Sequence, residues 1–159
     1  MLTTLIIQAK ALALSSVFPL FCVACHSEGS ALCNPCLLSL GMQAHYFCPV
    51  CFVVRSDWGV CCSSGSIDGL FAMTQHGNLI VQRALYQLKY GFVESIGVVF
   101  GRLVGVGLAG AAEVSRVLVP VPMHEKRLRV RDFNQAELVC QGIVMDSPEY
   151  TISTVLRRT

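Results

Sequence analysis

Eight of the nine cysteines of this 159-residue chain lie between Cys22 and Cys62. Two kinds of protein use cysteine at such density: secreted domains held by disulfides, and proteins of reducing compartments that bind zinc through thiolates. A secretory signal begins with basic residues and continues as an apolar run. Here the first four residues carry no positive charge, and Lys10 interrupts the apolar run. We therefore expect a cytoplasmic protein whose cysteines bind metal.

The cysteines are spaced as metal-binding pairs. Cys-x-x-Cys pairs begin at Cys22 and Cys33, and each pair can place two thiolates on one tight turn. Two such pairs complete a tetrahedral four-cysteine zinc site. A third pair begins at Cys48 and is followed by two adjacent cysteines. The candidate ligands are Cys22, Cys25, Cys33, Cys36, Cys48, Cys51, Cys61 and Cys62.

The number of zinc ions stays open at one or two. Adjacent cysteines are an irregular ligand pair, and an interleaved arrangement, in which the first pair joins the third, is also open. His26 or His45 can substitute for a cysteine ligand, or each can be a solvent-facing loop histidine, which is the commoner case. An all-cysteine set leaves no open coordination position, so we expect structural zinc rather than a hydrolytic centre. Cys140 stands apart on an apolar helical face, where a core position is expected.

The chain divides into three zones of different character. Residues 1–20 show apolar positions at helical spacing, which predicts a helix ended by Pro19. Residues 21–66 form the cysteine-rich zone, for which we expect a module organised by metal. Residues 67–159 hold long apolar segments. With 53% hydrophobic and only 14% charged residues, the chain is not intrinsically disordered, and no segment is a good membrane span.

Helices and buried strands alternate in the third zone. Apolar residues at helical spacing run from Val81 to Leu88, from Ile96 to Leu108 and from Ala136 to Ile143. Strands are predicted at residues 69–76, at 117–121, where a continuous apolar run is typical of a buried parallel strand, and at 150–156. This alternation predicts an α/β domain built on a parallel sheet.

A basic segment follows the predicted strand at 117–121. Four of the 12 basic residues of the chain lie within residues 126–131. Ligands of open α/β sheets bind beyond the carboxyl ends of the strands, and a basic loop that runs into a helix there suits phosphate or pyrophosphate. The alternative is a solvated, charged turn without a ligand.

Motifs along nearly the whole chain resemble those of the ComF family, which is related to type I phosphoribosyltransferases. The family hallmark is a Pro-Val-Pro-x-His strand end followed by spaced basic residues and Arg-Gly-Phe-Asn-Gln-Ala-Glu. Here the corresponding residues are 120–124 and 131–137. A Phe-Pro before the cysteine pairs (residues 18–19), an Ile-Asp start (67–68) and a Leu-Lys-Tyr helix end (88–90) match in order and spacing.

The resemblance implies a fold, a site and a biological setting. It implies an N-terminal helix and a double zinc ribbon, followed by a Rossmann-like phosphoribosyltransferase sheet. In complete relatives, phosphoribosyl pyrophosphate binds with Mg²⁺ and loses its pyrophosphate, and the family is linked to competence and DNA uptake. The positions that match the pyrophosphate side of that site are His124, Lys126, Arg127, Arg129, Arg131, Asn134 and Gln135. Asn134 and Gln135 would orient the diphosphate or cap the following helix.

The sequence also departs from the family pattern. Asp132 stands where the family has glycine, which adds negative charge at the end of the basic segment. The fourth cysteine pair is irregular. The sequence ends at Thr159, before the segment that carries two acidic residues and Thr-Thr-Gly in the family. We therefore expect an incomplete phosphoribosyltransferase-like sheet that exposes apolar surface, with no transferase activity of this chain alone.

Two other interpretations stay open. The chain can be a non-enzymatic module whose zinc ribbon and basic loop bind single-stranded DNA or a competence protein. Against this, residues 1–66 carry no net charge, and Phe133 is the only aromatic residue in the basic segment. The chain can also be a remnant without an independent function, in which case it would bind no metal.

Overall fold

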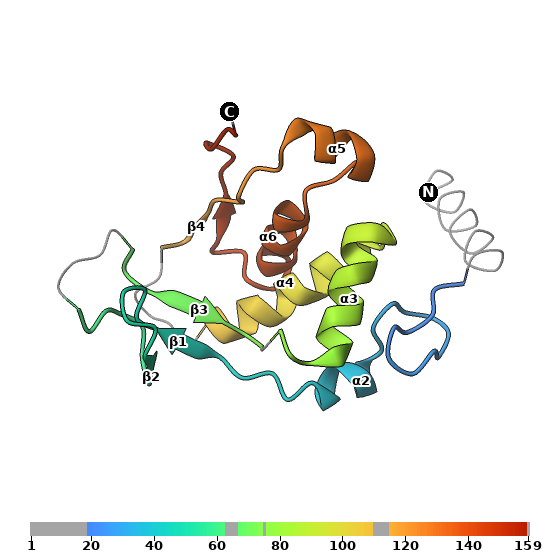
Figure 1. Ribbon diagram of the computed structural model, residues 1–159, viewed down its shortest axis with the longest axis horizontal. Helices are drawn as coiled ribbons and strands as arrows, with labels where there is room; N and C mark the ends of the chain where they lie inside the picture. The colour runs from blue at the N-terminus through green and yellow to red at the C-terminus, as the bar shows by residue number, and fades with distance from the viewer. Residues whose placement is uncertain (1–18, 63–66, 75, 110–114, 159) are drawn as a thin grey trace.

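The chain folds into a mixed α/β structure with two small sheets, seen in a computed structural model that describes residues 19–62, 67–74, 76–109 and 115–158 (Figure 1). The helix predicted over residues 1–20 falls, apart from Pro19 and Leu20, outside the described residues. Among the described helices, none is long and apolar enough to cross a membrane.

The cysteine-rich zone holds one short helix and two strands of an antiparallel sheet. Helix α2 spans Asn34–Ser39, and strands β1 (His45–Phe47) and β2 (Val54–Arg55) pair with each other. The third strand of this sheet, β3 (Leu70–Ala72), pairs with the other edge of β1. Because β3 lies beyond residue 66, the sheet joins the cysteine-rich zone to the third zone of the chain.

The three helices predicted in the third zone are confirmed. Helix α3 spans Leu79–Tyr90, α4 spans Glu94–Leu108 and α6 spans Gln135–Asp146. Two of them begin at asparagine caps: the Asn78 side chain accepts hydrogen bonds from the N–H groups of Ile80 and Val81, and Asn134 caps α6 in the same way. The caps account for where these helices begin, which apolar periodicity leaves undefined.

Helices α4 and α6 pack backbone against backbone. A Cβ placed on Gly101 would collide with the carbonyl oxygen of Val139, and one placed on Gly142 would collide with that of Val98. Gly97 faces Leu138 in the same interface, where an added Cβ would come within 2.8 Å of the leucine Cβ. The glycines that weaken α4 as an isolated helix are therefore what allows it to approach α6.

Strands β4 (Val117–Leu118) and β5 (Thr151–Ile152) form one parallel pair, packed against α6. Both strands are shorter than predicted. Pairing of β4 ends before Pro120, which has no N–H to donate to a neighbouring strand. The parallel connection predicted from the sequence is present, while the described sheet is limited to these two strands.

The basic segment is a helix rather than the loop predicted from the sequence. Helix α5 spans Glu125–Arg131, where neither glycine nor proline interrupts it. His124 caps its start by accepting the N–H of Lys126 on Nδ1 at 3.1 Å. It ends at Asp132, whose φ of 64° lies in the left-handed region that favours glycine. The glycine expected from the family pattern would adopt this conformation without strain.

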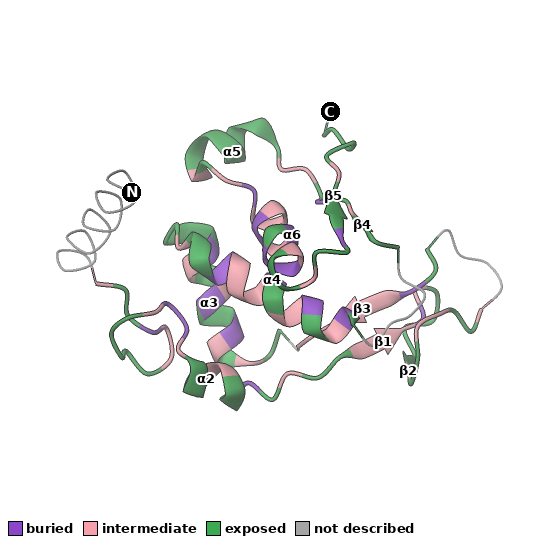
Figure 2. Cartoon of the chain, turned by 180° about the vertical axis from the view of Figure 1, so that it is seen from behind, coloured by how far each residue is buried: buried purple, intermediate pink, exposed green. Residues whose placement is uncertain are grey.

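The buried residues gather between the helices (Figure 2). Many large apolar side chains elsewhere in the described chain are exposed. Ala84, Leu88 and Ile96 pack with Leu138 where α3, α4 and α6 meet. Outside this core, Leu38 is 82% exposed and Val155 is 74% exposed. Exposed apolar side chains are therefore present, as expected from the composition.

The packing of α4 on α6 predicts opposite effects of one substitution at two glycines. Gly101→Ala forces the helices apart and should lower the free energy of unfolding by about 1–3 kcal/mol. Gly105→Ala adds a methyl group at ordinary contact distance, 3.5 Å from the nearest atom of Ile143, and should raise stability by up to about 1 kcal/mol through helix propensity. Denaturant unfolding of both variants measures the difference, and equal effects would contradict the described interface.

Candidate metal centres and a cationic groove

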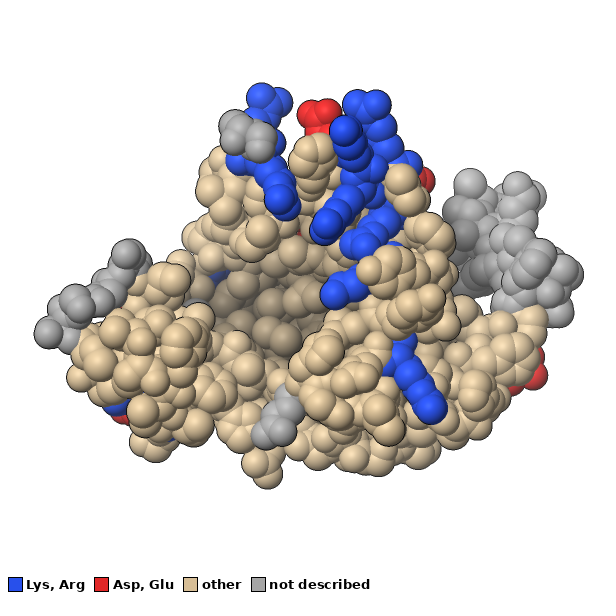
Figure 3. Space-filling model, in the orientation of Figure 1, with Lys and Arg blue, Asp and Glu red and all other residues tan. Residues whose placement is uncertain are grey.

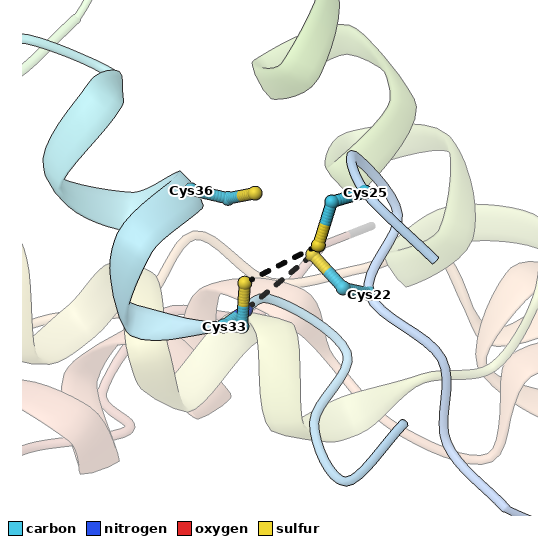
Figure 4. A group of neighbouring side chains, drawn as sticks. All are labelled: Cys22, Cys25, Cys33 and Cys36. Carbon is cyan, nitrogen blue, oxygen red and sulfur yellow. Dashed lines mark hydrogen bonds between the residues drawn. The ribbon is translucent and has the colours of Figure 1, made fainter. Parts of the chain in front are cut away.

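The first cysteine cluster lies where the chain enters helix α2. Cys22 and Cys25 come from the preceding loop, Cys33 is the N-cap of α2, and Cys36 lies in its first turn. The four sulfur atoms all lie within 4.8 Å of one another, with Cys25 and Cys33 3.5 Å apart. Figure 4 shows the four side chains pointing toward a common centre. The first pair therefore clusters with the second, and the interleaved arrangement is not adopted.

The second cluster holds the remaining four candidate ligands. The sulfurs of Cys48, Cys51, Cys61 and Cys62 also lie within 4.8 Å of one another. The shortest contact joins Cys51 to Cys61 at 3.3 Å, and the adjacent Cys61 and Cys62 place their sulfurs 3.9 Å apart. Adjacency thus does not prevent both sulfurs from facing one centre. Neither His26 nor His45 belongs to a cluster.

Both Cys-x-x-Cys pairs that begin a cluster have the same turn. The N–H of His26 donates to the carbonyl of Cys22, and the N–H of Phe52 donates to the carbonyl of Cys48, both at 2.9 Å. His26 and Phe52 follow the second cysteine of their pairs and have φ values of 60° and 58°. Glycine is the usual residue in this region. The turn is therefore set by the cysteine pair and not by the residue that closes it.

The ligand geometry fits a tetrahedral metal ion. A four-sulfur site with Zn–S bonds of about 2.3 Å has sulfur–sulfur edges of about 3.8 Å. The measured contacts of 3.3, 3.5 and 3.9 Å lie around that value, and all nine cysteines are free of disulfides. Each cluster can hold one metal ion, and thiolate donors are typical zinc ligands.

The pKa values of the thiols differ within each cluster: those of Cys22, Cys25 and Cys48 are lowered, and those of Cys36, Cys61 and Cys62 are raised. Burial raises the pKa of Cys22, but backbone N–H groups of Cys25 and its neighbours outweigh it and lower that pKa to about 6. The backbone N–H of Cys51 contributes most to lowering the pKa of Cys48, to about 5. In contrast, hydrogen bonds with neighbouring cysteine sulfurs raise the pKa values of Cys36 and Cys62 to about 12.

The two clusters differ in their surroundings. Cys22 is fully buried and packs with Leu32, Leu40 and Val81 in a core that extends onto α3 and α4. Cys48 is also fully buried, but the residues around its turn are exposed, among them Phe52 at 68%. The first cluster is thus part of the core between the helices, whereas the second organises a peripheral turn.

A cationic groove lies between the end of α3 and helix α5. Its volume is about 380 Å³. In the described part of the chain, none of its basic side chains forms an ion pair with a carboxylate. Figure 3 shows Lys and Arg side chains gathered over α5 and the C-terminal segment on one face. The groove is lined by Lys89, Tyr90, Phe92, Lys126, Arg127, Val130 and Arg131.

The structure separates the residues predicted as a phosphate site. Lys126, Arg127 and Arg131 line the groove, and Arg129 does not. Arg129 instead forms an exposed ion pair with Glu125, with 3.6 Å between its Nη2 and the glutamate Oε2. His124 caps α5. The sequence analysis includes Lys89 only in the Leu-Lys-Tyr motif and does not predict it as a site residue. Tertiary packing places it in the groove beside α5.

Asn134 and Gln135 lie at the start of α6 rather than in the groove. Besides capping α6, Asn134 donates from Nδ2 to the carbonyl of Val121 at 3.1 Å, which ties the segment after β4 to the helix. The predicted capping role of Asn134 is therefore confirmed. Gln135 has a buried Nε2 without a hydrogen-bond partner among the described residues.

The clusters and the groove are the features from which a function can be inferred. Comparisons with known protein families, curated proteins and solved structures found no match. Four convergent thiols suit a metal ion, and convergent cations without carboxylates suit an anion.

Single substitutions should remove one metal ion at a time. In the zinc-loaded protein, Cys36→Ser and Cys51→Ser should each lower the zinc content from two ions to one, because each removes a ligand from one cluster. Native mass spectrometry counts the ions. Cys140→Ala is the matched control, since Cys140 is buried on α6 outside both clusters and this variant should keep two ions.

The same variants should differ in stability. Because the first cluster shares its core with α3 and α4, Cys36→Ser should lower the temperature of global unfolding more than Cys51→Ser does. Thermal unfolding followed by circular dichroism compares them. A larger loss for Cys51→Ser would contradict the peripheral position of the second cluster.

Zinc affinity should fall as the pH is lowered. At pH 7 the Cys22 and Cys48 thiols, with pKa values of about 6 and about 5, are already ionised, and binding must displace protons from the thiols with raised pKa values, Cys36, Cys61 and Cys62. Once the pH falls below the pKa values of Cys22 and Cys48, protons also compete with the metal for these two thiols. The affinity should therefore fall more steeply per pH unit in that range than near pH 7. Chelator competition across pH measures this, and a pH-independent affinity would contradict thiolate ligation.

Proposed function

We propose that this chain is a ComF-family protein, related to type I phosphoribosyltransferases, that binds the diphosphate end of a phosphoribosyl ligand in the groove between α3 and α5. The observation that carries the proposal is the convergence of Lys89, Lys126, Arg127 and Arg131 without a carboxylate partner in the described part of the chain. A groove so charged has an electrostatic preference for a compact anion. Arginine and lysine together suit diphosphate, because guanidinium can bind two oxygens at once.

The place of the groove in the fold also supports the proposal. Helix α5 follows β4, and β4 pairs in parallel with β5. In Figure 1, α5 lies on the side of the molecule toward which these two strands run. Ligands of α/β sheets bind beyond the carboxyl ends of their strands. The position of α5 and the matching motif therefore support the same ligand class.

We infer a structural role for the two metal centres, as zinc ribbons of the same family. Four sulfur ligands complete the coordination of zinc and leave no position for a substrate. Cys22 packs in the core beside Val81 of α3, the helix that forms one wall of the groove. Zinc in the first cluster would therefore stabilise the scaffold of the anion site without contacting the ligand.

Pyrophosphate binding tests the proposed function directly. Isothermal titration calorimetry of the zinc-loaded chain with pyrophosphate should give binding that weakens as salt is added, because the attraction between exposed charges is screened. Arg127→Gln should weaken the affinity about tenfold or more, the scale of a lost charge-assisted hydrogen bond. Absence of pyrophosphate binding at low salt would refute the proposed site.

A second arginine on the same helix provides the comparison. Arg129→Gln removes the same charge from α5, but Arg129 is paired with Glu125 and lies outside the groove. It should weaken pyrophosphate binding much less than Arg127→Gln. Equal losses for the two variants would mean that net charge, and not the groove, holds the anion.

A further inference from the structure

Two exposed aromatic side chains stand among the cations of the groove. Tyr90 is 58% exposed and Phe92 is 51% exposed, and both line the groove. The guanidinium of Arg131 lies over the ring of Tyr90, 5.3 Å from its centroid, and Tyr86 packs against the same ring. This stacking holds Arg131 toward the groove before any ligand arrives.

Phe92 is held in a strained backbone conformation. Helix α3 ends with the N–H groups of Gly91 and Val93 both donating to the carbonyl of Gln87, at 2.9 and 3.3 Å. The residue between them must be left-handed, and Phe92 takes this place with a φ of 57°, while Gly91 has an ordinary φ of −93°. A bulky residue is disfavoured there relative to glycine because its Cβ crowds the backbone.

The core does not account for this strain. Half of the Phe92 side chain is exposed, and Phe92 is not among the residues of the buried clusters of the described chain. The conformation places the Phe92 side chain in the groove that Lys126, Arg127 and Arg131 also line. Strained residues that are not explained by packing are frequent at ligand sites.

We infer that the groove binds a free nucleotide, with its diphosphate on the basic side chains and its base stacked on Phe92. This inference rests on the proposed function and adds the base to the diphosphate. A bare diphosphate or a sugar phosphate would leave the Phe92 ring uncovered, whereas a nucleobase offers a flat face for stacking. The volume of about 380 Å³ lies within the range of small-ligand sites, about 300–1,000 Å³.

Calorimetry with ADP and inorganic pyrophosphate at equal ionic strength separates the base from the diphosphate. The zinc-loaded chain should bind ADP about 5- to 100-fold more tightly than pyrophosphate, the gain of one stacked base. Phe92→Leu should remove most of this gain and leave pyrophosphate affinity unchanged. One outcome overturns the nucleotide inference and leaves the proposed function standing. In that outcome pyrophosphate binds, ADP binds no more tightly than pyrophosphate, and Phe92→Leu changes the affinity for neither ligand. If neither ligand binds, both are overturned.

Two further variants separate stacking from folding. Phe92→Gly relieves the left-handed strain, so it should raise the unfolding temperature while it weakens ADP binding; a merely structural side chain would not give this opposite pair of effects. Phe52→Leu is the matched control, because Phe52 is also an exposed phenylalanine with positive φ but lies in the second cysteine turn. Its ADP affinity should equal that of the unchanged chain.

A single-stranded oligonucleotide completes the test, because its bases and phosphates share the chemistry of a free nucleotide. The groove gathers its cations at one place, so a short oligothymidylate should bind no more tightly than ADP. Oligonucleotide binding that is at least tenfold tighter than ADP binding and is lost in Phe92→Leu would assign the groove to nucleic acid and overturn the free-nucleotide inference.

Discussion

The close approach of α4 and α6 is the constraint on which the rest of the fold depends. Gly101 and Gly142 bring the two backbones into direct contact, and no side chain fits between them. Interiors are packed so tightly that such a contact defines the relative position of both helices. Helix α3 packs against α4 through Leu88 and Ile96. The parallel strand pair packs against α6 through Ile143 and Tyr150.

The two walls of the groove are held by different parts of this scaffold. Helix α3 is held by α4 and by the core around Cys22, so the first cysteine cluster packs against the helix that forms one wall. The other wall, α5, lies between β4 and α6 in the chain. Asn134, at the start of α6, donates a hydrogen bond to the carbonyl of Val121, which connects the segment after β4 to α6. The second metal centre organises a turn at the periphery. The first cysteine cluster and the groove are thus linked through packing rather than through shared residues.

The parts of the fold that follow from local pattern were predictable. Apolar periodicity predicts α3, α4 and α6, and the Cys-x-x-Cys spacing predicts two of the tight turns that hold the ligands. Helix α5 was missed because its residues are mostly charged and exposed, so it has no buried face to produce a pattern. It is held instead by the His124 cap and the ion pair of Glu125 with Arg129. The pairing of β3 with β1 was also missed, because three residues per strand carry little alternation.

The sequence by itself determined the eight clustered cysteines, the helix faces and the positive charge after β4, because each depends on residues close together in the chain. Tertiary structure decided which cations share a site. Lys89 and Arg131 are 42 positions apart, and they line one groove because α3 and α5 are brought together through α4 and α6. Tertiary structure also decided what shares a groove with Phe92: its left-handed conformation is set locally by hydrogen bonds at the end of α3, but Lys126, Arg127 and Arg131 belong to α5. Residue type and spacing encode local geometry, whereas a site built between distant elements exists only after they have packed.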